Sequence, residues 1–436
     1  MQDKIFALST AVGKSAVAIL RMSGEGTKAA LKEIFQPFPD KPNYLKHGNL
    51  TIDGLTDTAM LVYFDAPKSY TGEEMAEIHL HGSMPLVRLV SEKLFGLGFR
   101  TANNGEFTKR AYVNGKTNLS KAEGLADLVN AESLAALRAA GILARGGLGD
   151  IADGLQNDLT DCLARLEAAL DYPEEDLEGA EMPLVEEILT AAQEKIDGLL
   201  RTARQGKTAK FGARVAIVGD VNVGKSSLLN AIVGYDRAIV SSVKGTTRDT
   251  IEESIDFKGI KFTFIDTAGQ RETEDEIEMI GVRRAKAAME DADIILLVSD
   301  DDSSEPDWIK TSPVPTIFVK SKGDKDPTRQ KADIVVSGKT GENVQRLLEM
   351  IFDALGGRQV MTAPVLLTNQ RHEECLTSAQ ECIKEAKSMI RDGVTADLIA
   401  ATIRQAWQYV GQITGNTDMQ TVVDAIFSKF CLGKSD

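Results

Sequence analysis

The stretch Val215-Ala-Ile-Val-Gly219-Asp-Val-Asn-Val-Gly-Lys225-Ser-Ser-Leu-Leu-Asn230 joins an apolar run to a glycine-rich turn and a helical segment. A strand, a small-residue turn and a helix N-terminus in this order let backbone N–H groups surround phosphate oxygens. Lys225 could then reach the β- and γ-phosphate oxygens, and the Ser226 hydroxyl could ligate Mg²⁺. The stretch predicts a P-loop nucleotide site within an α/β unit.

Two further motifs follow the P-loop at the spacing of a nucleotide switch. Gly245-Thr-Thr-Arg-Asp249 supplies Thr247, whose hydroxyl could complete the Mg²⁺ shell only while the γ-phosphate is present. Asp266-Thr-Ala-Gly269 follows a buried strand, so Asp266 could hold a Mg²⁺-bound water and the Gly269 N–H could donate to the γ-phosphate. Together these motifs predict a two-state switch.

The choice of base is expected in Ser321-Lys322-Gly-Asp324, at the end of a predicted strand. The Asp324 carboxylate can accept two hydrogen bonds from guanine, whereas adenine offers no such pair of donors. Ser337-Gly338-Lys339 is similar to the companion guanine loop. Ser321 stands where the usual signature has Asn, which shortens the side chain, removes the amide and bears on nucleotide affinity. The motif favours GTP.

Composition bounds the class of protein. The chain of 436 residues exceeds what one hydrophobic core usually serves, so we expect two or three domains. Its hydrophobic content of 43% and charged content of 26% are typical of a globular protein. The formal net charge of −15 argues against a broadly cationic nucleic-acid-binding surface, although a local basic groove stays open.

The cysteines and the first residues of the chain indicate the cellular compartment that we expect. Four cysteines are too few and too scattered for a disulfide framework or a zinc cluster, and we interpret them as free thiols: Cys162, Cys375, Cys382 and Cys431. Cys375 and Cys382 share a helix face and are expected to pack in a core. The start lacks the plan of a signal peptide, and no apolar stretch is long enough to cross a bilayer. We expect a cytoplasmic protein without a membrane partner.

Hydrophobic spacing divides the first half of the chain in two. Residues 1–118 mix short strand-like runs, such as Ser15–Leu20, with one helical stretch at 85–97, which predicts an α+β domain. Residues 119–210 repeat apolar residues every three or four positions, as in Leu155, Leu159, Leu163, Leu166 and Leu170, which predicts helices. The acidic, proline-bearing piece at 171–183 is interpreted as a solvated loop between helices.

The second half contains the α/β unit and a return to helices. Residues 211–360 alternate helical stretches with six expected strands: Val215–Val218, Ile251–Phe257, Ile260–Ile265, Ile294–Val298, Thr316–Val319 and Asp333–Val336. Helical spacing returns in residues 361–436. The predicted architecture is therefore multidomain, with a helical-bundle domain interrupted by an inserted Ras-like P-loop α/β G domain.

Asn222 within the P-loop, the GTTRD motif at 245–249 and the tail Phe430-Cys-Leu-Gly-Lys434 together resemble the MnmE (TrmE) family of tRNA modification GTPases, over essentially the whole chain. The resemblance implies a K⁺ site, acting where other GTPases place an arginine finger, formed by Asn222, Ser241, Val243 and Thr246. It implies GTP contacts from Asn222, Val223, Gly224, Lys225, Ser226, Ser227, Ser241, Ser242, Val243, Lys244, Gly245, Thr246, Thr247, Asp266, Thr267, Ala268, Gly269, Ser321, Lys322, Asp324, Ser337, Gly338 and Lys339. Ser226 and Thr247 would ligate Mg²⁺.

The resemblance also implies a water-orienting glutamate beyond the second switch motif. By its spacing after Asp266, Glu278 is the matching residue. Gln270, directly after Gly269, is the rival candidate. The residues around Glu278 are acidic, and without the resemblance this run would be interpreted as a solvated helix face.

Motifs at both ends of the chain resemble the folate-binding signatures of the family. They are Ile19-Leu-Arg21-Met-Ser-Gly24, Ser69-Tyr-Thr-Gly-Glu-Glu-Met-Ala-Glu77 and Gly105-Glu-Phe-Thr-Lys-Arg-Ala-Tyr-Val-Asn-Gly-Lys116, with Lys434 in the tail. The resemblance implies that Arg21, Glu77, Lys116 and Lys434 bind a 5-formyl-tetrahydrofolate type of one-carbon donor. Cys431 is a candidate nucleophile or relay, or alternatively a small residue that ends an apolar helix. The chain continues beyond the lysine with Ser435-Asp436.

The function that the resemblance implies is GTP-driven addition of an aminomethyl-type group, such as carboxymethylaminomethyl, to C5 of the wobble uridine at position 34 of certain tRNAs. The protein would be a homodimer through its N-terminal domain and would work with an FAD-containing MnmG-type partner in a heterotetramer or larger complex. Glycine and ammonia both stay open as the nitrogen donor. A ribosome-assembly or regulatory GTPase of the Era or Der type is the alternative, since the G-domain motifs alone do not separate the two.

Overall fold

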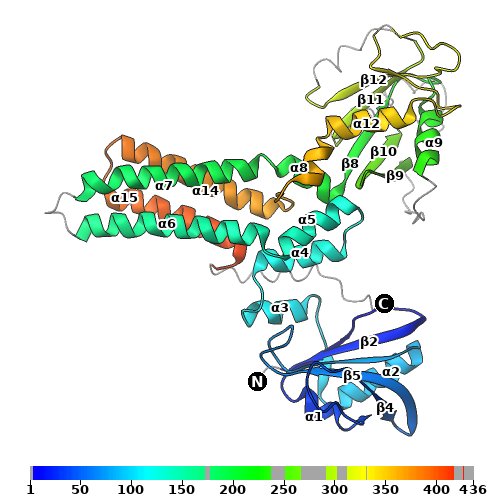
Figure 1. Ribbon diagram of the computed structural model, residues 1–436, viewed down its shortest axis with the longest axis vertical. Coiled ribbons are helices and arrows are strands. Elements are labelled where there is room, and N and C mark those ends of the chain that lie inside the picture. The colour runs from blue at the N-terminus through cyan, green and yellow to red at the C-terminus, as the bar shows by residue number, and fades with distance from the viewer. Residues whose placement is uncertain are drawn as a thin grey trace, which may run out of the picture. The chain divides into compact units, whose positions relative to one another are not determined.

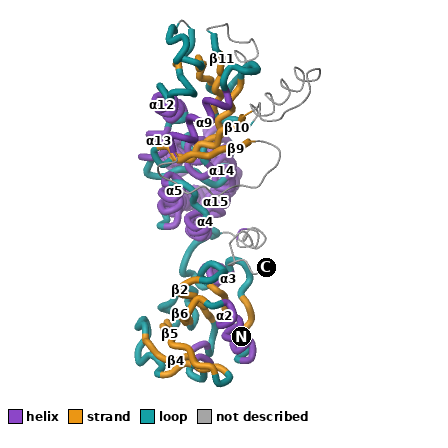
Figure 2. Tube along the Cα trace, turned by 90° about the vertical axis from the view of Figure 1, so that its right-hand side faces the viewer, coloured by secondary structure: helices purple, strands orange, loops and turns teal. Residues whose placement is uncertain are grey.

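The computed structural model describes residues 3–171, 177–236, 251–266, 291–301, 312–329, 331–416 and 426. The chain divides into two compact units, one formed by Met1–Ala126 with Gly411–Asp436 and the other by Asp127–Val410 (Figures 1 and 2). The multidomain α/β plus α fold class expected from the sequence is confirmed. Within the described part of the chain, no helix combines the length and the apolar character needed to span a membrane.

The first unit is built on a seven-stranded sheet with the order β3-β4-β5-β6-β2-β1-β7. The strands are β1 (Lys4–Leu8), β2 (Ser15–Ser23), β3 (Phe35–Gln36), β4 (Lys46–Ile52), β5 (Leu55–Phe64), β6 (Met75–Gly82) and β7 (Phe99–Thr101). Helix α2 (Met84–Gly96) buries Val90 and Leu94 in the same cluster as Leu20, Leu61 and Ile78 of the sheet. This confirms the helix expected at 85–97 and the α+β character of the unit.

Two helices of the first unit, α1 (Thr27–Leu31) and α3 (Glu106–Val113), were not expected from the sequence. With only 5 residues, α1 is too short for a periodic signal. Helix α3 buries Glu106, Thr108 and Arg110, so its inner face carries polar side chains rather than an apolar stripe. Helix α4 (Leu119–Val129) follows, and the boundary between the two units falls within it.

The second unit contains a bundle of long helices beside an α/β part (Figure 1). Its described helices are α5 (Leu134–Ala144), α6 (Gly147–Asp171), α7 (Leu177–Leu200), α8 (Ala203–Phe211), α9 (Lys225–Asp236), α12 (Val344–Ala354), α13 (Gly357–Thr362), α14 (Gln370–Arg391) and most of α15 (Ala396–Thr414). The end of α15, from Gly411 on, belongs to the first unit. In α6 the expected stripe is confirmed at Leu155, Leu159 and Leu166. Leu163 is only partly buried, and Leu170 is 45% exposed and does not belong to the stripe.

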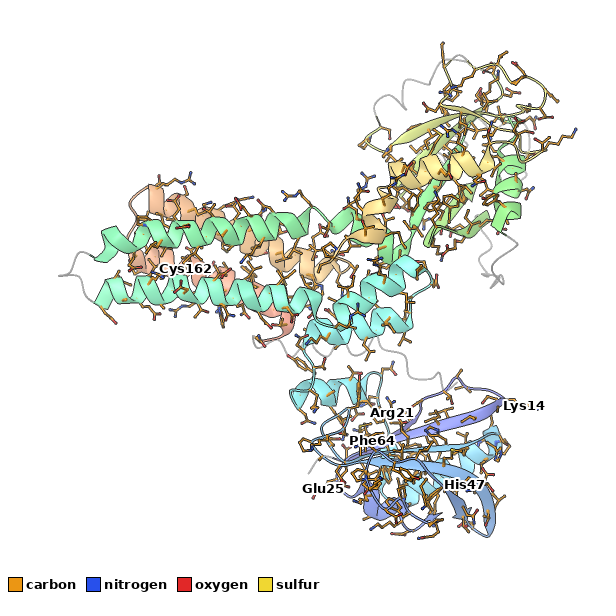
Figure 3. All side chains as sticks on the ribbon, viewed as in Figure 1. Lys14, Arg21, Glu25, His47, Phe64 and Cys162 are labelled. Atoms are coloured by element: carbon orange, nitrogen blue, oxygen red, sulfur yellow. The ribbon has the colours of Figure 1, made fainter. Side chains whose placement is uncertain are left out.

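Cysteine side chains lie inside the helical part, as expected. Cys162, Cys375 and Cys382 are buried and form no disulfide within the described part of the chain, while Cys431 lies outside it. Figure 3 marks Cys162 on α6, where its Sγ lies 3.9 Å from the Val185 carbonyl oxygen of α7. Burial raises the pKa of the Cys162 thiol to about 12, so this thiol stays protonated and acts as a packing group.

Helix α7 corrects the loop expected at 171–183. Helix α6 does end at Asp171, but α7 begins at Leu177 and contains Pro183. A proline inside a helix removes one backbone hydrogen bond and crowds the preceding turn. Beyond it, Val185 and Leu189 are fully buried on a helix that packs against α6 and α14. Burial of this apolar face stabilises the helix more than the proline disfavours it.

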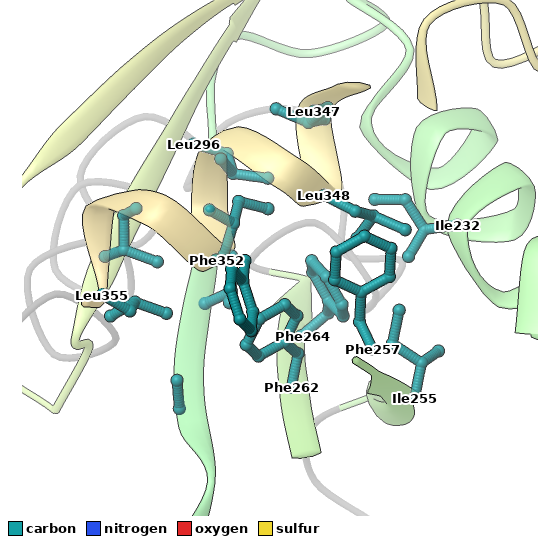
Figure 4. Packing of buried hydrophobic residues seen from close by; sticks show 14 of the residues in the cluster. Ile232, Ile255, Phe257, Phe262, Phe264, Leu296, Leu347, Leu348, Phe352 and Leu355 are labelled. Carbon is teal, nitrogen blue, oxygen red and sulfur yellow. The ribbon is translucent and has the colours of Figure 1, made fainter. Parts of the chain in front are cut away.

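The α/β part is a six-stranded sheet with the order β13-β12-β11-β8-β10-β9, parallel except for β9. All six expected strands are confirmed: β8 (Ala213–Val218), β9 (Ile251–Phe257), β10 (Ile260–Asp266), β11 (Ile294–Ser299), β12 (Thr316–Lys320) and β13 (Ile334–Val335). Figure 4 shows Leu348 and Phe352 of α12 packed over Phe262 and Phe264 of β10. The central strand β8 leads into the P-loop.

The tip of the β9–β10 hairpin contacts the start of α5, so the α/β part and the helical part share a joint. The Ala135 N–H donates to the Gly259 carbonyl oxygen at 2.8 Å. Lys261 Nζ lies 2.6 Å from Glu132 Oε2. Ala135 and Ala139 of α5 belong to the same buried cluster as the strands of the sheet.

Candidate functional site

The P-loop runs from the end of β8 to the start of α9, and its path depends on a close backbone approach at Gly219 and on left-handed backbone at two further positions. A Cβ at Gly219 would lie 2.0 Å from the Val298 carbonyl oxygen. Asn222 has a φ of 64° and Gly224 a φ of 103°, both in the left-handed region. The loop therefore turns tightly against β11 and delivers the chain into the helix that Lys225 opens.

Lys225 lies within the loop that precedes it. Its Nζ is 2.8 Å from the Gly219 carbonyl oxygen and 2.6 Å from the Asp220 carbonyl oxygen, and the residue is only 6% exposed. The ammonium and the electropositive N-terminus of α9 lie at the same end of the loop. Fixed positive charge at a helix N-terminus is the arrangement that binds phosphate. Lys225 and the start of α9 thus place positive charge where the sequence predicts phosphate binding.

Ser321 connects the segment predicted to recognise guanine, residues 321–324, to the P-loop. Its Oγ donates to the Val223 carbonyl oxygen, and the side chain is buried. Gly338 approaches the same region, because a Cβ there would lie 2.7 Å from the carbonyl carbon of Ser227 in α9. The structure thus brings the Ser321 and Ser337–Lys339 segments together with the P-loop, although they are about a hundred residues apart in sequence.

Asp324 lies exposed between these segments. The buried Ser337 hydroxyl donates to Asp324 Oδ1 at 2.9 Å. This hydrogen bond is the main cause that lowers the pKa of the Asp324 carboxyl, so the group is an anion able to accept hydrogen bonds at neutral pH. Lys322 has a φ of 56°, and its Nζ lies 2.6 Å from Asp300 Oδ2.

Many sequence-predicted site residues lie outside the described residues: Ser241, Ser242, Val243, Lys244, Gly245, Thr246, Thr247, Thr267, Ala268, Gly269, Gln270, Glu278, Cys431 and Lys434. For Asp266 the backbone alone is described. It ends β10 and pairs in register with Ile217 of β8, the strand that leads to the P-loop. The second switch motif therefore starts beside the phosphate site.

The first unit carries a second polar cluster, around Arg21 (Figure 3). Arg21 and Glu77 face each other across β2 and β6, with Arg21 Nε 2.8 Å from Glu77 Oε1. The Arg21 guanidinium lies 5.7 Å from the ring centre of Tyr70 and 5.9 Å from that of Phe107. Glu77 Oε2 is 3.6 Å from His79 Nε2, a buried nitrogen without a hydrogen-bond partner among the described residues.

Lys116 lies on the loop after α3 and reaches a neighbouring loop. Its Nζ donates to the Pro67 carbonyl oxygen at 3.0 Å, and a Cβ at Gly72 would lie 3.3 Å from the Lys116 Cγ. The folate candidates that the structure describes are Arg21, Glu77 and Lys116, and all three belong to the same unit. The 69–77 segment lies beside both Arg21 and Lys116. Tyr70, Phe107 and His79 also contact this cluster and were not named as candidates from the sequence, although they lie within or near the quoted motifs.

A buried ionic network stabilises the elements that carry the Arg21 cluster. Arg110 is 2.8 Å from Glu106 Oε1 and 3.1 Å from Glu73 Oε2. The Ser23 hydroxyl donates to Glu73 Oε2 at 2.7 Å and lies 2.7 Å from the Thr71 hydroxyl. The network fixes α3 and the 69–73 loop to β2, and these elements carry Phe107 and Tyr70 to Arg21.

Comparisons with known proteins cover the whole chain. A family model described as "GTP-binding protein TrmE N-terminus" matches residues 4–116, and one described as "MnmE helical domain" matches residues 119–431. A tRNA modification GTPase MnmE of Thermus thermophilus is 39% identical over 446 residues, which cover 100% of this chain and 99% of that protein. The MnmE of Natranaerobius thermophilus is 37% identical over 459 residues, which cover 99% and 100%.

Among solved structures, the chain is similar to Era in complex with MgGDPNP and nucleotides 1506–1542 of 16S ribosomal RNA. The identity is 25% and the TM-score 0.27, over 39% of this chain and 66% of that one. The G domain of the FeoB iron transporter from T. maritima has 24% identity and a TM-score of 0.24, over 33% of this chain and 98% of that domain.

Proposed function

The chain belongs to the MnmE family of tRNA modification GTPases and is a GTP hydrolase, and we propose that hydrolysis drives modification of the wobble uridine of tRNA. The product would be an aminomethyl-type group, such as carboxymethylaminomethyl, at C5 of uridine 34. The observation that carries the proposal is that one chain combines a formed P-loop with the polar Arg21 cluster of the N-terminal domain. A GTPase that serves only as a timer does not need that second cluster.

At the nucleotide site, the chain's own residues bind and orient GTP. Lys225 and the N-terminus of α9 supply positive charge for the phosphates, and the Ser226 hydroxyl is the proposed Mg²⁺ ligand together with Thr247. Asp324 is the proposed acceptor for the donor edge of guanine, and Ser337 holds its carboxylate. Glu278 is the proposed residue that orients the attacking water, with Gln270 as its rival.

K⁺ is the proposed ion beside the phosphates. Asn222 fits this role because its left-handed backbone lies in the P-loop and its side chain is exposed there. Ser241, Val243 and Thr246 would complete the ligand set. A bound K⁺ supplies positive charge that stabilises the charge developing on the transferred phosphate.

In the N-terminal domain, we propose a site for a 5-formyl-tetrahydrofolate type of donor. The Arg21–Glu77 pair beside two aromatic rings offers charge and flat apolar contact to one ligand. His79 Nε2, which has no hydrogen-bond partner among the described residues, adds a polar group. Lys116 and Lys434 are further proposed contacts, and Cys431 a proposed nucleophile or relay. The same proposal includes a cytoplasmic homodimer that works with an FAD-containing MnmG-type protein and tRNA. It also includes domain boundaries after residues 118, 210 and 360.

Nucleoside mass spectrometry of tRNA tests the proposed reaction. In cells that lack this protein, we expect the modified wobble uridine to disappear, and the wild-type gene to restore it. The Lys225→Ala variant should fail to restore it, because the P-loop then lacks its phosphate-binding ammonium. An unchanged nucleoside profile accompanied by ribosome-assembly defects would instead support a regulatory GTPase of the Era or Der type.

The rate of GTP hydrolysis in K⁺ and in Na⁺ tests the ion. We expect hydrolysis to be about 10-fold or more faster in K⁺, and the Asn222→Ala variant to lose this difference. Val221→Ala is the matched control, since Val221 is the exposed neighbour in the same loop, and it should keep the response to K⁺. Equal rates in both salts for the wild type would remove the role assigned to Asn222.

A further inference from the structure

Lys320, the last residue of β12, is a buried lysine directly before the guanine loop. Its Nζ donates to Asp326 Oδ2 at 2.8 Å, to the Thr328 carbonyl oxygen at 2.8 Å and to Thr328 Oγ1 at 3.3 Å. An ammonium leaves water at low cost only where oxygen acceptors replace its hydration. These three acceptors all belong to the segment that follows Asp324.

That segment returns to the sheet in a defined path. The Thr328 N–H and hydroxyl both bond to Asp326 Oδ1, at 3.0 and 2.6 Å, which closes a tight turn. Further along, Ala332 packs with Leu297 and Phe318, and the Asp333 N–H donates to the Phe318 carbonyl oxygen at 2.8 Å. Lys320 thus ties the middle of an exposed loop to the end of a buried strand.

Asp324 therefore lies between two anchors. Upstream, Ser321 donates to the Val223 carbonyl oxygen of the P-loop. Downstream, Lys320 holds the Asp326–Thr328 turn. Asp324 is only three residues from Ser321 and two from Asp326, so its backbone has little freedom before a nucleotide binds. Preorganisation of this kind lowers the conformational entropy lost on binding.

We propose that Lys320 is a positioning residue for guanine recognition, which holds the Asp324 carboxylate toward the base without touching the nucleotide. The inference rests on the proposed role of Asp324 and assigns a function to a buried lysine that the P-loop chemistry does not use. Lys320 would also make the guanine loop more rigid, a role that the usual Asn at position 321 would otherwise share.

The dissociation constants of GDP and IDP test the proposal. IDP lacks the 2-amino group, so it offers Asp324 one hydrogen-bond donor where GDP offers two. For the wild type we expect a clear preference for GDP. Lys320→Met should weaken GDP binding by about 10-fold and lower the ratio between the two nucleotides, because a loosened carboxylate loses its alignment with both donors. Lys331→Met removes the same charge from the exposed end of the loop and should leave the ratio unchanged.

Each of three results would overturn the proposal, and they are distinguishable. A Lys320→Met protein with a lower melting temperature but the wild-type GDP-to-IDP ratio would restrict Lys320 to a role in stability. A wild type that binds both nucleotides equally would remove the guanine role of Asp324 itself. Should Lys320→Met not fold, Thr328→Ala deletes one of the three acceptors and should lower the ratio in the same direction by a smaller factor. An unchanged ratio in that variant would also contradict the proposal.

Discussion

At the residue scale, the P-loop and the proposed guanine loop are shaped by a close backbone approach at Gly219 and a hydrogen bond from Ser321. Gly219 leaves space for the Val298 carbonyl oxygen, and Ser321 donates to the P-loop from a position where the usual signature has Asn. A hydroxyl is short, but the approach of the two loops is close enough for it to bond. The substitution at 321 therefore keeps a connection between the loops while losing the amide.

Gly219→Ala should weaken nucleotide binding by about 100-fold, because the new Cβ would lie 2.0 Å from the Val298 carbonyl oxygen and force the P-loop away from β11. Gly234→Ala is the control, since a Cβ there meets nothing within 4 Å and the residue lies inside α9. It should raise the free energy of unfolding by about 0.5–1 kcal/mol. Isothermal titration with GDP compares nucleotide binding by the two variants, and urea unfolding measures the stability of Gly234→Ala. Normal GDP binding by Gly219→Ala would contradict the geometry.

Among the elements, α3 and α7 form for reasons that local sequence does not display. Helix α3 buries an ionic network instead of an apolar stripe, and α7 tolerates Pro183 because its apolar face packs against two other helices. Both elements are stabilised by partners that are distant in sequence. Arg110 of α3, for example, bonds to the Asp3 carbonyl oxygen at 2.9 Å, 107 positions away.

Acid should loosen α3. Burial alone would raise the pKa of the Glu106 carboxyl, but hydrogen bonds from Arg100, the Asn103 N–H and Arg110 outweigh it and lower that pKa from 4.5 to about 2. A folded-state pKa below the unfolded value stabilises the protein above about pH 4.5, and this contribution is lost as the pH falls toward 2. It amounts to roughly 2–3 kcal/mol.

Scanning calorimetry between pH 6 and about pH 2.5 checks this expectation. In the wild type, the melting temperature of the first unit should fall as the pH is lowered across that range. In Glu106→Gln the melting temperature at pH 6 should be lower and should depend less on pH, because the neutral amide cannot lose a charge. Parallel pH profiles for the two proteins would show that Glu106 does not carry the acid sensitivity.

At the scale of the molecule, the joint between α5 and the β9–β10 hairpin connects the helical part to the G domain. The hairpin runs between the two switch segments in sequence, and its tip at Gly259 contacts Leu134 and Ala135. The joint lies within one compact unit and shares its buried cluster with the sheet. Stability of the G domain should therefore depend on α5.

Gly259→Ala should destabilise this unit by about 1 kcal/mol more than Gly393→Ala. Both glycines have positive φ, 83° and 68°, so both substitutions strain the backbone. Only the Cβ at 259 would also lie 3.1 Å from the Leu134 Cβ, whereas the one at 393 meets nothing within 4 Å. Urea unfolding compares the two variants, and equal losses would mean that the joint adds no stability.

The P-loop, the six strands of the G domain and most of the apolar stripe of α6 could be predicted from the sequence, because each is a local pattern of apolar residues and glycines. Which polar groups meet became visible only in the folded structure: Arg21 with Glu77 across two strands, Lys320 with the turn at Asp326, and Ser321 with Val223. These contacts join residues whose separation in the chain carries no periodic signal. Their geometry follows from strand order and register, which are fixed only when the whole core packs.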